Sequence, residues 1–555
     1  MADDLTPLLI QVRMQIYGTA RKGSTFLHRC LGGGCFFVMY VKMLSATVAG
    51  VEGRLIEVEV DIASGLPQVN VVGLPDPAIR ESIERVRTAI RNGGMKFPLD
   101  RITVNLAPAD MRKEGSAFDL AIAAGILGAS GQLPPEMLEG SLLIGELSLS
   151  GEIKAVPGVL PMVERARNEG LKQVFVPRAC VAEASLIEGI RVRGIGSLGE
   201  WIIGGGRAQI YPLESPGKGA AFSSVPADTD AEIDLSDVIG QQHGKRALLI
   251  AAAGMHNVLF MGPPGTGKTM LCRRLPTLLP HLDDDEALAV TKIYSVSGKL
   301  PGERRGLIRQ RPFRSPHHTV SAAGLIGGGS VPKPGEVTLA HHGVLFLDEM
   351  PEFQRAALEA LRQPLEDRHV TIGRARGVVR FPARFMLACS MNPCPCGFYG
   401  TDSSSAPGKN ACTCTTIAIS RYRGRMSGPL ADRIDLQVEM PRQASPGGVR
   451  GGLSSAEARA IVEAAFERQF HRYRKLGIRW NSELHGRHLR QHAALSGSAE
   501  KLLHTTYDRM GLSFRAHDRI LKMARTIADL DSSDAIREEH VAEAIQYRCL
   551  DRSEV

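Results

Sequence analysis

The chain has 555 residues, which is too long for one compact core and predicts about three folded units at roughly 150 residues per domain. Hydrophobic residues make up 43% and charged residues 23% of the chain, an ordinary globular composition that excludes disordered and fibrous proteins. The net charge of +8 indicates a polyanionic partner only if the basic residues are concentrated in one place.

Cysteine spacing and hydropathy indicate a cytoplasmic protein. The ten cysteines lack the dense, regular spacing of a secreted disulfide scaffold. The most apolar early stretch, residues 31–41, is shorter than the ~20 residues of a membrane helix and lies too far into the chain for a usual signal peptide. We therefore predict a cytoplasmic protein without a membrane partner, and we interpret residues 1–42 as a poorly ordered extension before Met43.

Strand and helix patterns alternate over residues 43–203, as in an α/β domain. Residues 55–61 and 68–73 have strand-like patterns, and residues 78–93 have helical spacing that ends at a pair of glycines. The segment that follows, residues 204–232, gathers Gly, Pro, Ser and Ala with little periodicity. This composition is typical of a flexible linker.

A phosphate-binding loop is the strongest motif in the chain. It matches G-x-x-x-x-G-K-[ST], follows the apolar strand of residues 257–261 and precedes a helix that begins near Met270. In such a loop, backbone N–H groups bind phosphates at a helix N-terminus, the lysine adds positive charge and the hydroxyl binds Mg²⁺. The predicted ATP-binding residues are Gly262, Pro263, Pro264, Gly265, Thr266, Gly267, Lys268 and Thr269, of which Thr269 is also a predicted Mg²⁺ ligand.

Two later apolar strands end in polar residues that fit the same site. Residues 343–347 lead into Asp348 and Glu349, and residues 386–391 lead into Asn392. We predict that Asp348 holds Mg²⁺ through water and that Glu349 polarises the attacking water as a general base. Asn392 could orient the same water, although a single Asn is equally compatible with a turn.

Two arginines are candidates for neutralising the charge of the transition state. Arg433 lies in the segment Gly-Pro-Leu-Ala-Asp-Arg, and Arg515 lies in Leu-Ser-Phe-Arg. An always-ionised guanidinium matches the geometry of phosphate. From the residues alone, both are equally compatible with surface arginines.

From Met43 onward, the order of motifs resembles the magnesium-chelatase-like AAA+ ATPases of the YifB/ComM family. The most specific segments are Phe313-Arg-Ser-Pro-His-His318, Pro334-Gly-Glu336, Gly343 to Pro351, and Ser427-Gly-Pro429 with Asp432-Arg433. The resemblance implies an α/β fold in which residues 233–445 form a P-loop AAA+ core and residues 446–555 form a C-terminal helical lid. It further implies a homo-oligomeric ring, expected to be a hexamer.

The same resemblance assigns roles to the candidate arginines and the asparagine. It implies that Arg433 is an arginine finger that reaches the ATP of a neighbouring subunit. It also implies that Arg515 is the sensor-2 arginine on the lid and that Asn392 is sensor 1.

The N-terminal domain resembles the Lon-protease type, an α/β fold like domain 2 of ribosomal protein S5, in which a serine and a lysine cooperate in peptide hydrolysis. The resemblance rests on residues 113–119 and 144–153, and Ser116 lies near the expected position of the nucleophile. The segment that would supply the lysine reads Leu160-Pro161, and a serine nucleophile needs an adjacent base. We therefore interpret residues 43–203 as a protease-like domain without the catalytic dyad.

Basic residues concentrate in two segments that point into the central pore of related AAA+ rings. Residues 299–318 contain six basic residues and one acid, and residues 368–384 form an apparent hairpin with glycines at its turn. Their arginines would bind DNA phosphates without sequence preference and in a salt-sensitive way. Solvated arginine faces or inter-subunit ion pairs are equally compatible with the residues alone, but the resemblance favours DNA. The predicted DNA contacts are Arg374, Arg376, Arg311 and Arg314.

Four cysteines flank a polar loop directly after Asn392. The pairs Cys394-Pro-Cys396 and Cys412-Thr-Cys414 could form a closed, tetrahedral Zn²⁺ site with a structural role. Because C-x-C spacing is less typical of zinc sites than C-x-x-C, free thiols or a redox pair are an equal alternative.

Together these features predict an ATP-hydrolysing ring motor that uses ATP and Mg²⁺ and acts on single-stranded or branched DNA. The resemblance implies a helicase or translocase that promotes branch migration during natural transformation and recombination. One alternative is a chelatase-type motor that remodels a protein partner. Another is an ATP-switched scaffold that binds without translocation.

Overall fold

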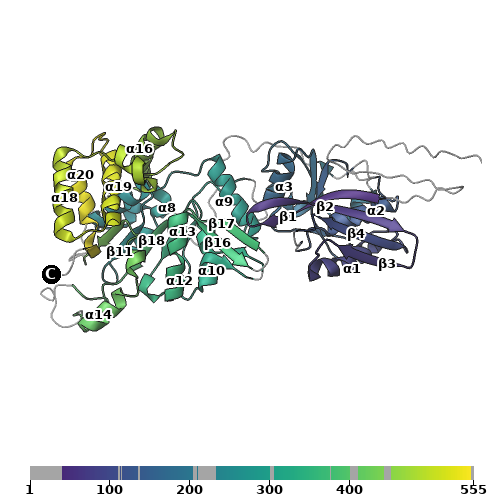
Figure 1. The fold of residues 1–555 in the computed structure, drawn as a ribbon, viewed down its shortest axis with the longest axis horizontal. Helices are drawn as coiled ribbons and strands as arrows, with labels where there is room; N and C mark the ends of the chain where they lie inside the picture. Colours follow the sequence, from purple (N-terminus) through teal and green to yellow (C-terminus); the bar gives the residue numbers. More distant parts are fainter. Residues whose placement is uncertain are drawn as a thin grey trace, which may run out of the picture. The chain divides into compact units, whose positions relative to one another are not determined.

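The chain forms two compact units in a computed structural model (Figure 1). One comprises the chain up to Glu214 except residues 49–51, and the other comprises those three residues and the chain from Ser215 onward. Among the described helices, none combines the length and hydrophobicity that crossing a bilayer requires. The described residues are 40–110, 113, 115–134, 138–203, 209–210, 233–300, 306–329, 331–374, 377–400, 411–442 and 452–551.

The N-terminal unit contains a mixed eight-stranded sheet in the order β10-β9-β8-β5-β1-β2-β4-β3. Its strands are β1 (Tyr40–Ala49), β2 (Glu52–Ala63), β3 (Gln68–Val72), β4 (Arg101–Ala107), β5 (Ser141–Leu143), β8 (Gln173–Pro177), β9 (Arg191–Ile195) and β10 (Gln209–Ile210), and a separate pair is formed by β6 (Glu146–Leu147) and β7 (Ile153–Lys154). The helices are α1 (Pro77–Asn92), α2 (Asp119–Ala129), α3 (Val159–Asn168), α4 (Val181–Ala184) and α5 (Leu198–Ile203). The alternation of strands and helices that the sequence predicts is therefore present.

The first strand corrects the predicted start of this domain. β1 begins at Tyr40, three positions before Met43, because Val41 is buried in the core and the Tyr40 hydroxyl donates to Glu59 Oε1 at 2.6 Å. Burial of an apolar side chain and a hydrogen bond hold these residues in the sheet.

The second unit is built on a parallel five-stranded sheet in the order β12-β15-β18-β11-β19. Three of these strands are buried along their whole length, as expected for a sheet covered on both faces. Parallel strands place all their carboxyl ends at one edge, where ligands bind in open α/β sheets. The strands are β11 (Val258–Met261), β12 (Phe313–Arg314), β15 (Val344–Leu347), β18 (Met386–Met391) and β19 (Leu436–Glu439).

Short helices and two hairpins surround this sheet. The hairpins are β13 (Gly327–Gly328) with β14 (Lys333–Pro334), and β16 (His369–Arg374) with β17 (Gly377–Pro382). The helices are α6 (Gln242–Gly254), α7 (Lys268–Cys272), α8 (Leu275–Leu278), α9 (Asp284–Val296), α10 (Ala322–Ile326), α11 (Glu336–Leu339), α12 (Arg355–Ala360), α13 (Arg362–Asp367), α14 (Thr416–Arg423) and α15 (Gly428–Ala431).

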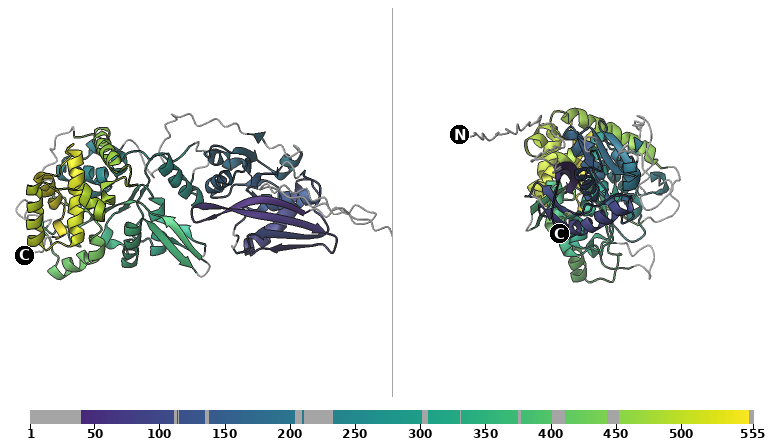
Figure 2. Two further views of the ribbon diagram at one scale, coloured as in Figure 1. Left: turned by 45° about the horizontal axis from the view of Figure 1, so that its top comes forward. Right: turned by 90° about the vertical axis from the view of Figure 1, so that its right-hand side faces the viewer.

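The C-terminal segment of the second unit is helical, as predicted (Figure 2). Its helices share a hydrophobic core with the sheet. Ser454 caps its first helix through a capping box with Glu457, and the helix extends to Tyr473. Ile520 is among the residues of the last long helix that pack into the shared core. The helices are α16 (Ser455–Tyr473), α17 (Gly486–His492), α18 (Gly497–Met510), α19 (Phe514–Leu530) and α20 (Glu538–Gln546).

A buried ion cluster ties this helical segment to the rest of the unit. The Glu286 carboxylate on α9 lies 3.1 Å from Arg311 Nη2, 2.9 Å from Arg479 Nη1 and 3.3 Å from His342 Nδ1. Burial alone would raise the pKa of Glu286, but the His342 hydrogen bond and the charges of Arg311 and Arg479 outweigh it and lower the pKa to about 2.

This cluster predicts acid sensitivity. At a pH well above 4.5, the ordinary pKa of a glutamate, the lowered pKa stabilises the folded chain by about 3 kcal/mol. About 2 kcal/mol of this stabilisation is lost when the pH falls to 3, because protons bind preferentially to the unfolded state. Urea unfolding of the wild type and of Glu286→Gln should therefore show a difference in unfolding free energy that narrows from pH 7 to pH 3. An unchanged difference would contradict the assignment.

Candidate ATP-binding site

The phosphate-binding loop follows β11 and opens at the carboxyl edge of the parallel sheet. Gly262 has no room for a side chain, because a Cβ there would lie 2.4 Å from the backbone oxygen of Met440. Gly265 and Gly267 adopt φ of 79° and 87°, and a Cβ at either would meet nothing within 4 Å. Backbone turns of this kind expose successive N–H groups on an open face, which suits phosphate oxygens.

Lys268 is held in this loop by three oxygen atoms. Its Nζ donates to Gly262 O at 2.7 Å, Pro263 O at 2.9 Å and Asn392 Oδ1 at 3.1 Å. The side chain is buried, and this burial lowers its pKa, while the nearby carboxylates of Asp348 and Glu349 act in the opposite direction. A partly desolvated ammonium in this position gains from a phosphate anion.

Thr269 and Asp348 form a set of oxygen donors that fits Mg²⁺. The Thr269 hydroxyl donates to both carboxylate oxygens of Asp348 at 3.1 Å. Mg²⁺ prefers such hydroxyl and carboxylate oxygens and retains several waters. When bound, Mg²⁺ neutralises charge on the β- and γ-phosphates. The two residues predicted as its ligands are therefore brought together.

Ser390 connects the two carboxylate residues, and the sequence interpretation missed it. Its hydroxyl donates to Asp348 and accepts from the backbone N–H of Glu349 at 3.1 Å. Glu349 itself adopts a left-handed φ of 51° and its side chain is exposed at the end of β15. A non-glycine residue in this conformation is often found at functional sites. A polar residue within the otherwise apolar strand 386–391 is the signal that could have indicated this role.

Arg433 and Arg515 line one cavity, and that cavity is separate from the phosphate-binding loop. The cavity has a volume of about 740 Å³, and residues 262–269 are not part of its lining. Arg433 is paired with Glu366 on α13 and donates to Pro429 O at 2.7 Å, whereas Arg515 near the start of α19 is exposed. The lining also contains Arg368 and Arg384, which the sequence interpretation had assigned to the basic hairpin segment, and Arg519 and Lys522, which it missed.

Two of the four predicted DNA contacts are engaged within the chain. Arg311 is buried, and its guanidinium donates to Pro280 O at 2.7 Å, to His342 O at 2.8 Å and to the Glu286 carboxylate. Arg314 donates to both carboxylate oxygens of Glu336 at 2.6 and 3.0 Å. The prediction for Arg311 is wrong because its donors are already used by internal acceptors, and Arg314 also has its charge compensated.

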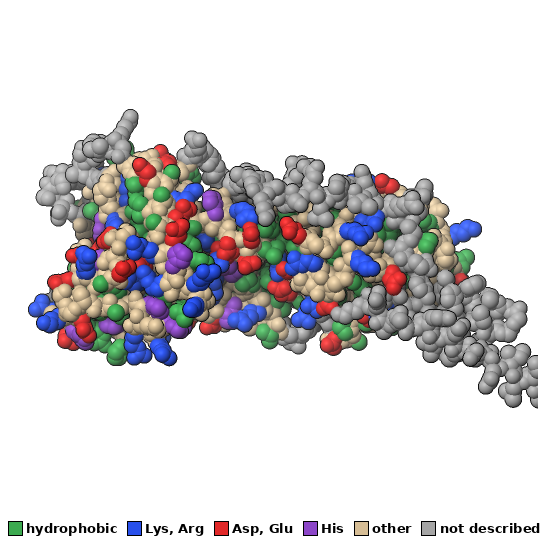
Figure 3. All heavy atoms as spheres, turned by 90° about the horizontal axis from the view of Figure 1, so that it is seen from above, with side chains coloured by type: hydrophobic (Ala, Val, Ile, Leu, Met, Phe, Trp, Pro, Cys, Tyr) green, Lys and Arg blue, Asp and Glu red, His purple; other side chains and the backbone are tan. Residues whose placement is uncertain are grey.

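The other two predicted contacts belong to the hairpin of β16 and β17, which is present. Arg374 pairs with Gly377 in the register of the two strands. Arg376 and the side chain of Arg374 lie outside the described residues. On the face drawn in Figure 3, Lys and Arg side chains lie among Asp and Glu side chains.

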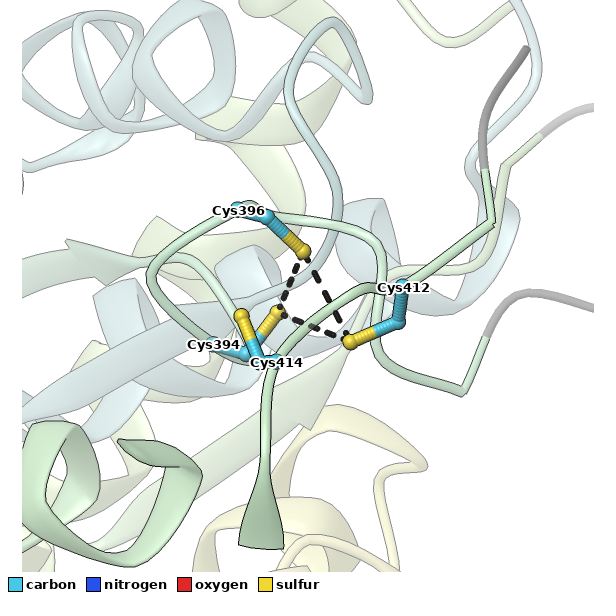
Figure 4. Close-up of side chains that lie close together, drawn as sticks. All are labelled: Cys394, Cys396, Cys412 and Cys414. Atoms are coloured by element: carbon cyan, nitrogen blue, oxygen red, sulfur yellow. Dashed lines mark hydrogen bonds between the residues drawn. The ribbon is translucent and has the colours of Figure 1, made fainter. Parts of the chain in front are cut away.

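The four predicted metal-binding cysteines converge on one point (Figure 4). All four sulfur atoms lie within 4.8 Å of one another. Cys412 Sγ lies 3.7 Å from Cys394 Sγ and 3.6 Å from Cys396 Sγ. A regular tetrahedron with Zn–S bonds of about 2.3 Å has sulfur–sulfur edges of about 3.8 Å. The thiols therefore fit the requirements of a closed zinc site.

The Ser116 hydroxyl in the N-terminal unit is bonded to a carboxylate. It donates to Glu146, while the buried Lys113 donates instead to Pro108 O. Leu160, where the lysine base was expected, is buried in the first turn of α3. That this domain lacks peptidase chemistry stays a prediction.

Comparisons with known proteins match most of the chain. The family described as "Magnesium chelatase, subunit ChlI" matches residues 234–446, "Subunit ChlI of Mg-chelatase" matches residues 58–180, and "Magnesium chelatase, subunit ChlI C-terminal" matches residues 452–548. "Uncharacterized protein YifB" of Escherichia coli is 43% identical over 91% of this chain and 96% of its own length. "Competence protein ComM" of Haemophilus influenzae is 42% identical over the same shares. "Lon protease 2" of Bacillus subtilis is 30% identical over 22% of this chain and 25% of its own length.

Proposed function

The chain belongs to the YifB/ComM family of magnesium-chelatase-like AAA+ ATPases, and on this premise we propose that it is an ATP-driven ring motor that acts on DNA. The observation that supports ATP hydrolysis best is the convergence of Lys268, the Thr269–Asp348 pair and Asn392 at the carboxyl edge of one parallel sheet. These groups bind phosphate, hold Mg²⁺ and place an amide beside the lysine. Glu349 then polarises the attacking water.

The location of the two candidate arginines supports the proposal of a ring. Arg433 and Arg515 line a cavity to which the chain's own phosphate-binding loop does not contribute. A head-to-tail contact that closes into a ring would bring this basic cavity to the loop of the next subunit. Both guanidiniums would then stabilise the charge on the γ-phosphate of the neighbour during hydrolysis.

We propose DNA as the macromolecule on which the motor acts for two reasons. Arg374 is the last residue of β16, and Arg376 follows it in the sequence before β17 begins. Arginines in such a turn would bind phosphates independently of sequence. The H. influenzae relative is named a competence protein. We therefore propose branch migration of DNA joints during natural transformation and recombination.

The test measures ATP turnover of the purified protein alone and with single-stranded, duplex and four-way-junction DNA. We expect stimulation by DNA in the wild type and its loss in the double variant Arg374→Ala/Arg376→Ala, with basal turnover retained. Stimulation should also fall steeply as salt increases. The matched control is Arg487→Ala/Arg490→Ala, which removes the same charge from the exposed face of α17 and should keep the stimulation.

Each alternative function has its own outcome in this test. Hydrolysis that is identical with and without every DNA would instead favour a motor that remodels a protein, in line with the match to magnesium chelatase. ATP binding without turnover would favour an ATP-switched scaffold.

We also propose that the four clustered thiols hold a structural Zn²⁺ in addition to the ATP and Mg²⁺ of the motor. The sulfur–sulfur separations support this assignment, and four protein ligands leave no open position for a substrate. About one zinc per chain is expected after purification without chelators.

A further inference from the structure

The cysteine cluster has two arms, the pair Cys394 and Cys396 and the pair Cys412 and Cys414. Both arms are joined to the ATP-binding site through the polypeptide chain. Cys394 lies two residues after Asn392, whose side chain accepts a hydrogen bond from Lys268. Cys414 lies two residues before α14, which ends at Arg423. The four metal ligands therefore lie between the end of β18, which is followed by Asn392, and the start of α14.

One arm packs directly against the phosphate-binding loop. Gly397 has a φ of 87°, and a Cβ at this position would lie 2.8 Å from Cδ of Pro264. The turn is anchored to the cluster, because the backbone N–H of Tyr399 donates to Cys394 Sγ at 3.3 Å. A close contact of this kind transmits a shift of the turn to the loop.

The other arm reaches the backbone of Asn392. The Tyr422 side chain on α14 is buried beside the Asn392 backbone, and this burial raises the pKa of the Tyr422 hydroxyl to about 12 while the Asn392 backbone acts in the opposite direction. Arg423 donates to Pro393 O at 3.2 Å, and its guanidinium lies 5.1 Å from the ring centre of Tyr399. Contacts from α14 therefore hold both sides of the segment that follows β18.

We propose that zinc bound by Cys394, Cys396, Cys412 and Cys414 is the support that positions Asn392 and Pro264, so that zinc occupancy sets the rate of ATP hydrolysis. This inference rests on the proposed ATPase function. Pro264 meets this segment from the phosphate-binding loop, and Asn392 precedes it at the end of β18. The metal would join the two arms at all four cysteines, in addition to the contacts that Arg423 makes with Pro393 and Tyr399. A displacement of about 1 Å in a catalytic site can reduce turnover by up to about a hundredfold.

The main test compares the wild type with Cys396→Ser/Cys414→Ser in the full chain. Zinc content by mass spectrometry should fall from one per chain to none, and kcat should fall about tenfold or more. The affinity for a fluorescent ATP analogue should fall less, by about threefold, because Lys268 and the loop amides are retained. Cys549→Ser, outside the cluster, should keep the zinc content, kcat and affinity, and thermal melting checks that each variant is folded.

Two variants separate positioning by the arms from metal binding itself. Tyr422→Phe removes only the hydroxyl that contacts Asn392, so zinc should remain while kcat falls and KM stays constant. Gly397→Val introduces a side chain against Pro264, so zinc should remain while KM rises. A merely structural role of these residues would lower the melting temperature without this division between kcat and KM.

Three results would overturn the inference. The first is wild-type protein that contains no zinc, and the second is a folded, zinc-free variant that turns over ATP at the wild-type rate. If zinc-loaded wild type hydrolyses no ATP at all, the proposed function fails instead. In that case the inference is tested by the affinity for the ATP analogue. Equal affinity of the zinc-loaded wild type and the zinc-free variant is the third result that would overturn it.

Discussion

Glu349→Gln is expected to reduce ATP turnover by about 10²- to 10⁴-fold, the usual contribution of a general base, and to leave ATP binding intact. The amide keeps the size of the side chain but cannot accept a proton from the attacking water. In the proposed mechanism, phosphate and Mg²⁺ are bound by other groups, namely Lys268, Thr269 and Asp348, which the structure brings together independently of Glu349. Binding of a fluorescent ATP analogue and steady-state release of phosphate measure the two effects separately.

Two control variants make this result specific. Glu352→Gln alters a carboxylate three residues away that pairs with Arg425 at 3.0 Å, and it should keep nearly the wild-type rate. Lys268→Ala removes the buried ammonium from the loop and should abolish binding as well as turnover. If Glu349→Gln lost binding together with turnover, Glu349 would be a support of the nucleotide site rather than its base.

The arrangement of the candidate catalytic residues near the phosphate-binding loop was predictable because each follows a run of apolar residues. A parallel sheet brings the ends of β11, β15 and β18 to one edge, so the positions of Lys268, Asp348 and Asn392 follow from local patterns alone. Lys268 donates to Asn392 and Thr269 donates to Asp348, so the predicted groups lie at the same edge of the sheet. Ser390 was not predicted, because a polar residue in an apolar strand marks the position as unusual without identifying the residues that its hydroxyl will contact.

The arginines were harder to interpret because their roles depend on partners far away in the sequence. Arg311 lies in a strongly basic segment, but its acceptors come from α9, from Pro280 and from His342, two residues before β15. Charge counts cannot distinguish such an internal ion pair from a free cation, since the difference lies in tertiary contacts. Likewise, only the fold places Arg433 and Arg515 in one cavity.

Arg433→Ala is expected to reduce ATP turnover by about 10³-fold or more, the usual effect of losing an arginine finger. The variant should still bind ATP, because its phosphate-binding loop, Mg²⁺ ligands and Glu349 are unchanged. Thermal melting controls for the loss of the ion pair with Glu366, in which Arg433 is mostly shielded from solvent. Loss of ATP binding in a folded variant would contradict the role.

Mixing this variant with Lys268→Ala determines whether the arginine acts across a subunit boundary. Neither variant hydrolyses ATP alone, since one lacks the guanidinium and the other cannot bind the nucleotide. In a randomly mixed ring at equal amounts, roughly a quarter of sites would combine an intact loop with an intact Arg433 from the next subunit. Turnover should therefore recover to a comparable fraction of the wild-type rate. Mixing with Lys268→Ala/Arg433→Ala should give no recovery. If the first mixture also stayed inactive while rings still formed, Arg433 would serve the ATP site of its own chain, and its separation from residues 262–269 would have to close by a movement within one subunit.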